Sequence, residues 1–146
     1  MKLLVQRVNE ASVTIEGSIF SQISSGLLLY ICFERGDSDQ TIAKAIKKIT
    51  ALRVFEDDKQ KMNLSIKDLE LELLAVSQFT LSWDGQKGNR PSFEKSLEPN
   101  AANERYEQFC KLLNSELNNK VKLGKFGADM KISSINDGPV TFFLSF

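Results

Sequence analysis

The residues Gly26-Leu27-Leu28-Leu29-Tyr30-Ile31-Cys32-Phe33 constrain the fold of this 146-residue chain more than any others. A strand sends successive side chains to opposite faces of its sheet, and this stretch is apolar on both. A half-exposed strand would alternate apolar and polar residues instead, so the stretch predicts a central strand that is covered on both sides. It is also the longest apolar run in the chain, and it falls far short of the ~18–20 residues that cross a bilayer.

Segments rich in β-branched residues on either side of this stretch predict further strands. The first two are separated by Asn9-Glu10, and the last two by a turn at Asn136-Asp137-Gly138-Pro139. We place these strands at residues 3–8, 11–15, 19–23, 71–81, 130–135 and 140–146.

Two segments repeat apolar residues with helical period. Asp37 or Ser38 can cap the first helix, and Asn100 can cap a second that runs to about Asn118. No repeat or interdomain linker separates these elements. Many strands with two segregated helices predict one α+β domain over residues 1–146. The apolar faces are Ile42, Ile46 and Ile49 in the first helix, and Ala102, Tyr106, Phe109, Leu113 and Leu117 in the second.

The composition excludes several kinds of site. Nineteen Lys and Arg balance nineteen Asp and Glu, and the chain has no histidine. Without histidine there is no Ser-His-Asp or Cys-His catalytic arrangement and no His-ligated zinc or haem. Cys32 and Cys110 form no CxxC motif, so we interpret both as buried thiols and expect neither a metal nor a cofactor. The amino-terminal residues turn polar too early for a signal peptide, so we expect a cytoplasmic protein.

Two motifs toward the carboxyl end could act on an ester. Ser77-Gln78-Phe79-Thr80-Leu81 ends a buried strand, where freed backbone N–H groups could stabilise the oxyanion of a carbonyl under attack. The alternative, a polar strand end that meets solvent, is equally compatible with these residues. In Asn136-Asp137-Gly138-Pro139-Val140-Thr141, an ordinary turn is favoured over a cis Gly138-Pro139 bond on spacing alone.

Two further motifs could contact a nucleic acid. Gly88-Asn89-Arg90-Pro91-Ser92-Phe93 lies in a loop over residues 82–93 that is long enough to suggest a function. Its arginine could bind phosphate or hold the loop through a salt bridge. Lys125-Phe126-Gly127-Ala128-Asp129-Met130 could form a stacking wall for a base, although a core phenylalanine is the commoner outcome.

In this order, the four motifs closely resemble the D-aminoacyl-tRNA deacylase (D-tyrosyl-tRNA(Tyr) deacylase) family, the type with a Gly-cisPro motif. The motifs that carry the resemblance also include Gln6-Arg7-Val8 and Ala11-Ser12-Val13 near the amino terminus. The resemblance runs from residue 2 to residue 146. One departure is Trp83, which is bulky where the family pattern suggests a small residue. The resemblance implies a homodimer with a barrel-like, mostly antiparallel sheet and two main helices.

The resemblance also implies an activity and a role for each motif. Such proteins hydrolyse the ester that joins a D-amino acid to the terminal adenosine of tRNA, and they remove glycine mischarged onto tRNA(Ala). Gly138-Pro139 would enter the partner's pocket and exclude an L side chain. The other implied site residues are Ser77, Gln78, Phe79 and Thr80 for catalysis, Arg7 and Asn136 for support, and Phe126 and Met130 beside the adenosine.

Without histidine, no strong general base is available near neutral pH. We therefore favour a mechanism in which the vicinal 2′-hydroxyl of the RNA assists water, over a nucleophilic Thr80.

Zero net charge limits recognition to the tRNA acceptor end, through a few phosphate contacts such as Lys87 and Arg90. We expect neither a membrane nor DNA as a partner. Two alternative functions from other classes of protein remain open. One is a catalytically inert module that binds and shelters the aminoacyl end of RNA, and the other is a carrier of small molecules. Further lysines considered as phosphate contacts are Lys44, Lys47, Lys48, Lys120, Lys122 and Lys125.

Overall fold

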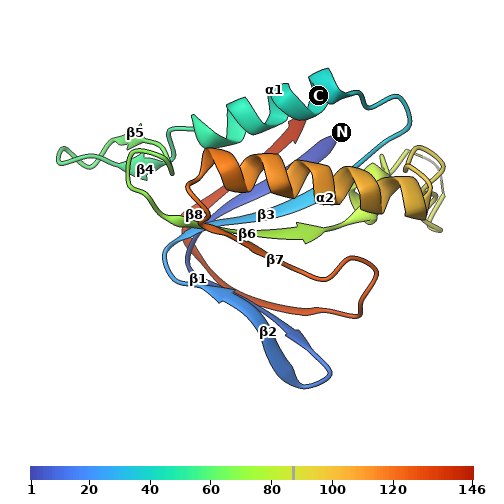
Figure 1. The fold of residues 1–146 in the computed structure, drawn as a ribbon, viewed down its shortest axis with the longest axis horizontal. Coiled ribbons are helices and arrows are strands. Elements are labelled where there is room, and N and C mark those ends of the chain that lie inside the picture. Colours follow the sequence, from blue (N-terminus) through green and yellow to red (C-terminus); the bar gives the residue numbers. More distant parts are fainter. Residues whose placement is uncertain (87) are drawn as a thin grey trace.

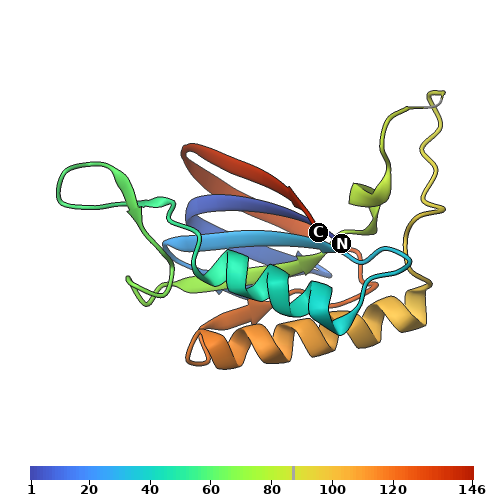
Figure 2. The ribbon, with the colours of Figure 1, turned by 90° about the horizontal axis from the view of Figure 1, so that it is seen from above.

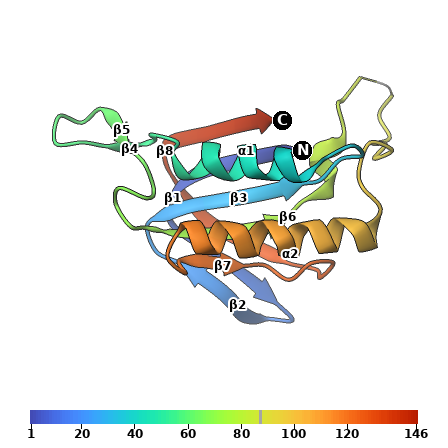
Figure 3. The ribbon, with the colours of Figure 1, turned by 45° about the horizontal axis from the view of Figure 1, so that its top comes forward.

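The structure, a computed structural model, describes residues 1–86 and 88–146. One sheet has the strand order β2-β1-β3-β6-β7, with β8 also paired to β1, and β4 and β5 form a separate hairpin. Both long helices cover the same face of this sheet and lie side by side (Figures 1 and 3). The elements are β1 (Lys2–Ile15), β2 (Ser18–Ile23), β3 (Gly26–Cys32), α1 (Asp39–Thr50), β4 (Phe55–Glu56), β5 (Met62–Leu64), β6 (Glu72–Ser77), the 3-10 helix η1 (Phe79–Ser82), α2 (Pro99–Glu116), β7 (Val121–Leu123) and β8 (Lys131–Ser145).

The central strand predicted from the sequence is β3, between β1 and β6. Its residues Leu27, Leu29 and Ile31 face the core under the two helices. Leu28 faces the opposite way, into a smaller core enclosed by the sheet itself. Both faces of β3 are therefore buried, as the apolar run predicts.

The sheet curls until its two ends meet. Ser21 of β2 donates its hydroxyl to the carbonyl of Leu123 in β7, at 2.8 Å. Strand β1 is antiparallel to β2, β3 and β8, whereas β6 is parallel to both of its neighbours. The predicted α+β fold with a barrel-like, mostly antiparallel sheet is confirmed.

The helix faces are confirmed and one helix start is corrected. Ser38 caps α1 and forms a capping box with Thr41. Helix α2 begins at Pro99, so the predicted cap at Asn100 is wrong; the fixed φ of proline suits a first helical turn, where no N–H is needed. The buried residues of α2 include Tyr106, Phe109 and Leu113.

The turn predicted at residues 136–139 is a bulge within one continuous strand, β8. Both halves of β8 pair with β1, with Val8 opposite Asn136 and Gln6 opposite Thr141. Residues 137–140 therefore stand opposite Arg7 alone, and they arch out of the sheet. The break predicted at Asn9-Glu10 is also only a shift in register, because β1 continues through it.

Both cysteines are buried and free, as interpreted from the sequence. Among the described residues, no helix combines the length and the apolar content that crossing a membrane requires.

Candidate functional site

A cavity of about 630 Å³ lies where the carboxyl ends of β3 and β6 meet. Ser77, Gln78 and Phe79 line it, and so do Phe126 and Met130 from the segment before β8. Phe93, the last residue of the motif at residues 88–93, lines it too, so the structure brings together three of the motifs singled out in the sequence. A second cavity, of about 420 Å³ beside the bend of β1, contains none of the predicted site residues.

Directly after β6, two backbone N–H groups find no acceptor within the described residues. Gln78 N–H still donates to the carbonyl of Ile31 at 2.7 Å, after which the chain turns into η1. The N–H groups of Phe79 and Thr80 open this helix, where no preceding turn supplies an acceptor. Neither group has a partner among residues 1–86 and 88–146. The strand predicted to continue to Leu81 therefore ends at Ser77, and this early end frees the two donors.

Thr80 is exposed, and its hydroxyl oxygen accepts a hydrogen bond from the Gln78 side-chain amide at 2.6 Å. Thr80 does not line the cavity, whereas Gln78 does. An amide cannot take a proton from a hydroxyl group near neutral pH. This contact therefore orients the Thr80 side chain without activating it as a nucleophile.

Cys32 is a site residue that the sequence interpretation placed only in the core. It lines the cavity, and its thiol lies 3.5 Å from the carbonyl of Phe79. Burial, with a smaller contribution from the carboxylate of Glu34, raises the pKa of Cys32 to about 11. The thiol is therefore protonated at neutral pH and donates to that carbonyl, which helps to hold the start of η1.

The opposite wall is aromatic and apolar. Phe126 packs against the core under the helices, with its ring centroid 5.9 Å from that of Tyr106. The Tyr106 hydroxyl donates to the carbonyl of Ala75 in β6 at 2.8 Å, so this wall is fixed to the strand that leads to Ser77. Met130 packs against the smaller core.

A second cluster surrounds the bulge of β8. The Arg7 guanidinium is buried and donates through Nη1 to the carbonyl of Val54 at 2.7 Å. Its Nε lies 2.8 Å from the carboxylate of Asp137. Asn136 donates its amide to the carbonyls of Arg7 and Val140, at 3.2 and 3.1 Å. These contacts fix both flanks of Gly138-Pro139, whose peptide bond is cis.

Replacement of Arg7 by alanine is expected to lower the free energy of unfolding by about 2 kcal/mol, because it leaves the carbonyl of Val54 without its donor and removes the ion pair with the Asp137 carboxylate. Arg53→Ala is the matched control. Arg53 is exposed and also donates to a carbonyl, that of Asn63 at 2.6 Å. The control should lose no more than about 0.5 kcal/mol in urea unfolding. Equal losses for the two variants would contradict the role given to Arg7.

The two clusters are far apart within one chain. Arg7 pairs with Leu27 at the beginning of β3, whereas the cavity lies beyond Ile31 at its end. Leu27 and Ile31, which lines the cavity, are four residues apart, so at ~3.3 Å per strand residue the bulge lies roughly 13 Å from the edge of the cavity. One chain therefore cannot bring Gly138-Pro139 and Ser77 into contact in this fold.

The loop after η1 carries the predicted phosphate contact Arg90, which is exposed and forms no ion pair with the described residues. The other, Lys87, lies outside the described residues. Lys120 and Lys122 lie near the carboxylates of Glu70 and Glu72. Within residues 1–86 and 88–146, no cluster of His, Cys, Asp or Glu could hold a metal ion.

Comparisons with known proteins cover nearly the whole chain. The family model described as D-Tyr-tRNA(Tyr) deacylase matches residues 4–145. A D-aminoacyl-tRNA deacylase of Magnetococcus marinus is 48% identical over 99% of this chain and 95% of its own length. One from Finegoldia magna is 49% identical over 99% of this chain and 97% of its own length.

Two solved structures share this fold. One, described as c-Myc DNA unwinding element binding protein, has a TM-score of 0.97 and 38% identity, and covers 100% of this chain and 99% of its own. The other, described as a probable eukaryotic D-amino acid tRNA deacylase, has a TM-score of 0.84 at 16% identity, with 98% and 97% covered.

Proposed function

This chain belongs to the D-Tyr-tRNA(Tyr) deacylase family, and from that premise we propose that it hydrolyses the ester between a D-amino acid and the terminal adenosine of tRNA. The observation that carries the proposal is the pair of N–H groups on Phe79 and Thr80, which have no partner in the part of the chain that the structure describes and lie beside a cavity large enough for an aminoacyl nucleoside. Residues 1–146 act as one deacylase domain in the cytoplasm.

The Phe79 and Thr80 N–H groups donate to the substrate carbonyl oxygen as it gains negative charge. Water attacks the carbonyl carbon, the bond from that carbon to the 3′ oxygen breaks, and the 3′ oxygen takes up a proton. The free amino acid and the tRNA leave. The vicinal 2′-hydroxyl assists the water, since the chain has no histidine to act as a base. Ser77 and Gln78 line the pocket and orient the ester.

Thr80→Val is expected to retain activity within about threefold of the wild type, because the backbone N–H of residue 80 remains and the hydroxyl has no activating base. The readout is the rate of D-tyrosine release from D-tyrosyl-tRNA in single turnover. A loss of several hundredfold, together with a trapped acyl-enzyme in the wild type, would establish the nucleophilic mechanism instead.

Two chains form each active site in this proposal. Gly138-Pro139 cannot reach the cavity of its own chain, so we assign it to the cavity of a second copy in a homodimer. There its carbonyls accept the substrate amino group and occupy the space that an L side chain would need. Glycine has no side chain for such a barrier to reject, so the same site also clears glycine from tRNA(Ala). Arg7 and Asn136 hold the barrier in place.

The rest of the cavity receives the RNA. Phe126 and Met130 border the terminal adenosine, with Phe126 available for stacking. Arg90 contacts a phosphate in the acceptor end. With no excess positive charge on the chain, only a few phosphates are neutralised, and binding depends weakly on salt.

The direct test is to incubate the purified protein with D-tyrosyl-tRNA and L-tyrosyl-tRNA in parallel and follow the free amino acid. Release from the D form alone supports the proposal. Tight binding without release would indicate an RNA-sheltering module, and absence of RNA binding would indicate a small-molecule carrier. Equal release from both enantiomers would refute the stereochemical barrier.

A further inference from the structure

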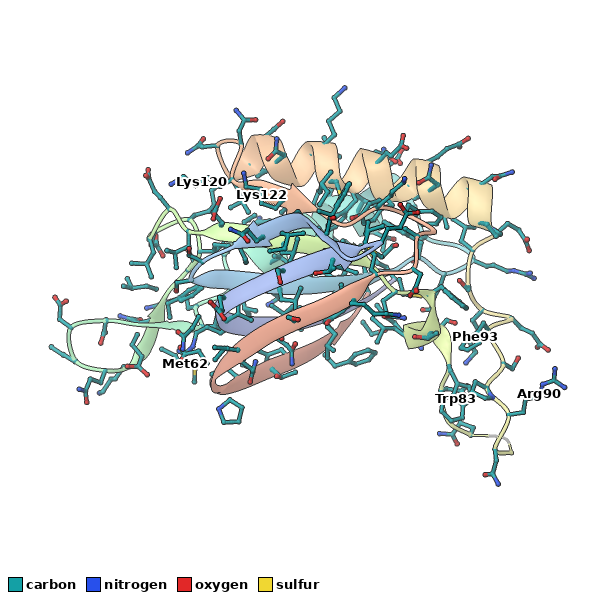
Figure 4. All side chains as sticks on the ribbon, turned by 90° about the horizontal axis from the view of Figure 1, so that it is seen from below. Met62, Trp83, Arg90, Phe93, Lys120 and Lys122 are labelled. Atoms are coloured by element: carbon teal, nitrogen blue, oxygen red, sulfur yellow. The ribbon has the colours of Figure 1, made fainter. Side chains whose placement is uncertain are left out.

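An exposed aromatic and basic ledge adjoins the proposed active-site cavity. It consists of Phe79, Trp83, Arg90 and Phe93, on η1 and the loop that follows it. Trp83 is 38% exposed and Phe79 is 57% exposed. Figure 2 shows the loop standing away from the body of the fold, and Figure 4 shows Trp83, Arg90 and Phe93 together on it, at the end of the molecule opposite Met62.

The ledge is held in place and continuous with the cavity. The Phe79 and Phe93 rings pack edge to face with centroids 4.9 Å apart, and both residues also line the cavity. Trp83 N–H donates to the carbonyl of Thr80 at 3.2 Å, which fixes the Trp83 backbone to η1. Lys95 and Asp84 form an ion pair at 2.7 Å that ties the two arms of the loop together.

Its chemistry matches single-stranded RNA. Proteins bind unpaired nucleotides by stacking bases on exposed aromatic rings and contacting the backbone with cations. Trp83 offers the ring, and Arg90 offers a guanidinium that no carboxylate of the described residues neutralises. Trp83 lies one residue beyond the helix that carries the two N–H donors, so a strand whose last nucleotide enters the cavity can reach its partly exposed ring.

We propose that Trp83 stacks on an unpaired nucleotide immediately 5′ of the terminal adenosine, and that Arg90 contacts the adjoining phosphate. This inference rests on the proposed function, because the cavity must hold the terminal adenosine for its neighbour to reach the ledge. Trp83 is then a substrate-binding residue for the RNA rather than for the amino acid.

The chain has one tryptophan, so its intrinsic fluorescence reports on Trp83 alone. The protein is titrated with an RNA hairpin that carries no amino acid and ends in a four-nucleotide 3′ tail. Parallel titrations use the blunt hairpin and adenosine monophosphate. The tailed hairpin should quench the fluorescence, whereas the other two probes should not. Quenching by the blunt hairpin to the same extent, or by none of the three, would overturn the proposal.

Kinetics separate the ledge from the catalytic site. Trp83→Ala is expected to lower kcat/KM on D-tyrosyl-tRNA by about 10- to 100-fold, the usual loss for one stacked base, and Trp83→Phe should restore most of it. Neither variant should change hydrolysis of D-tyrosyl-adenosine, which lacks the preceding nucleotide. Phe20→Ala is the matched control, since Phe20 is 52% exposed on β2 and lies outside the cavity.

The outcomes distinguish four failures. An equal loss on both substrates would show that Trp83 shapes the cavity, and no loss on either would show that it is idle; both overturn the proposal. A change in the sedimentation of Trp83→Ala, with the affinity of this variant for the tailed hairpin in filter binding equal to that of the wild type, would assign the ledge to contacts between copies of the chain. If the wild type hydrolyses neither substrate, the proposed function itself fails.

Discussion

Phe79→Pro should lower the rate of ester hydrolysis by about 100- to 1,000-fold, the usual effect of removing one donor to an oxyanion. Proline removes the N–H of residue 79 while fitting the local backbone. Phe79 opens η1, where the fixed φ of proline is tolerated. The preceding Gln78 has φ −147° and ψ 81°, outside the helical region that a following proline disfavours.

The matched control for this change is Phe79→Ala, which also removes the ring but keeps the N–H. It should retain much more activity than Phe79→Pro, because only the side chain and its contact with Phe93 are lost. Both variants should show the same unfolding midpoint within a few degrees by circular dichroism. Activity that falls equally in the two would mean that the ring, and not the backbone donor, matters at this position.

Gly138→Ala should reduce the rate of D-tyrosyl-tRNA hydrolysis by about 100-fold, since a displacement of about 1 Å in a positioning group can cost that much. Gly138 has φ +123°, which side chains rarely adopt, and an added Cβ would lie 2.7 Å from Val140 Cγ2 and 3.2 Å from Arg7 Nη2. The main chain must shift, and with it the carbonyls that the proposal places at the substrate amino group.

Gly17→Ala is the control for backbone strain. Gly17 also has a positive φ, of +79°, but an added Cβ there meets nothing within 4 Å. It lies in the turn between β1 and β2 and lines neither cavity. Gly138→Ala should lose more stability than Gly17→Ala in urea unfolding, because only its Cβ meets close neighbours, and only Gly138→Ala should lose activity. Full activity of Gly138→Ala would show that this glycine does not position the carbonyls that meet the substrate.

The sequence predicts the elements whose burial follows from their own pattern of apolar residues. The apolar run at residues 26–33 is buried on both faces, and the periodic apolar positions of both helices face the core. Each of these predictions depends on side-chain pattern alone.

The remainder depends on pairing between distant segments. Asn136-Asp137-Gly138-Pro139 has the composition of a turn, yet β1 pairs with both flanks of it and makes it a bulge. Likewise, the residues after Ser77 look like more strand, but β7 pairs only with residues 73–75 of β6, and the chain leaves the sheet soon after. Composition does not reveal where the pairing with a neighbouring strand stops. The predictions of a strand up to Leu81 and of a turn at residues 136–139 are therefore wrong.

The sequence also left the two parts of the site without a spatial relation. The Ser77–Thr80 segment and Gly138-Pro139 both come toward the carboxyl end, but β3 holds them at opposite ends of its length. Arg7, far away in the sequence, proves to be the residue that contacts Asp137.

In the proposed homodimer, each active site combines donors from one chain with Gly138-Pro139 from the other. Phe79→Pro and Gly138→Ala dimers, each nearly inactive, are mixed under conditions that allow subunits to exchange. Half of the dimers are then mixed, and each of these carries one site with an unaltered Phe79 facing an unaltered Gly138. We predict recovery of about 25% of wild-type activity on D-tyrosyl-tRNA, as two-fold symmetry requires. Activity that stays at the level of the separate variants after exchange is complete would contradict the claim.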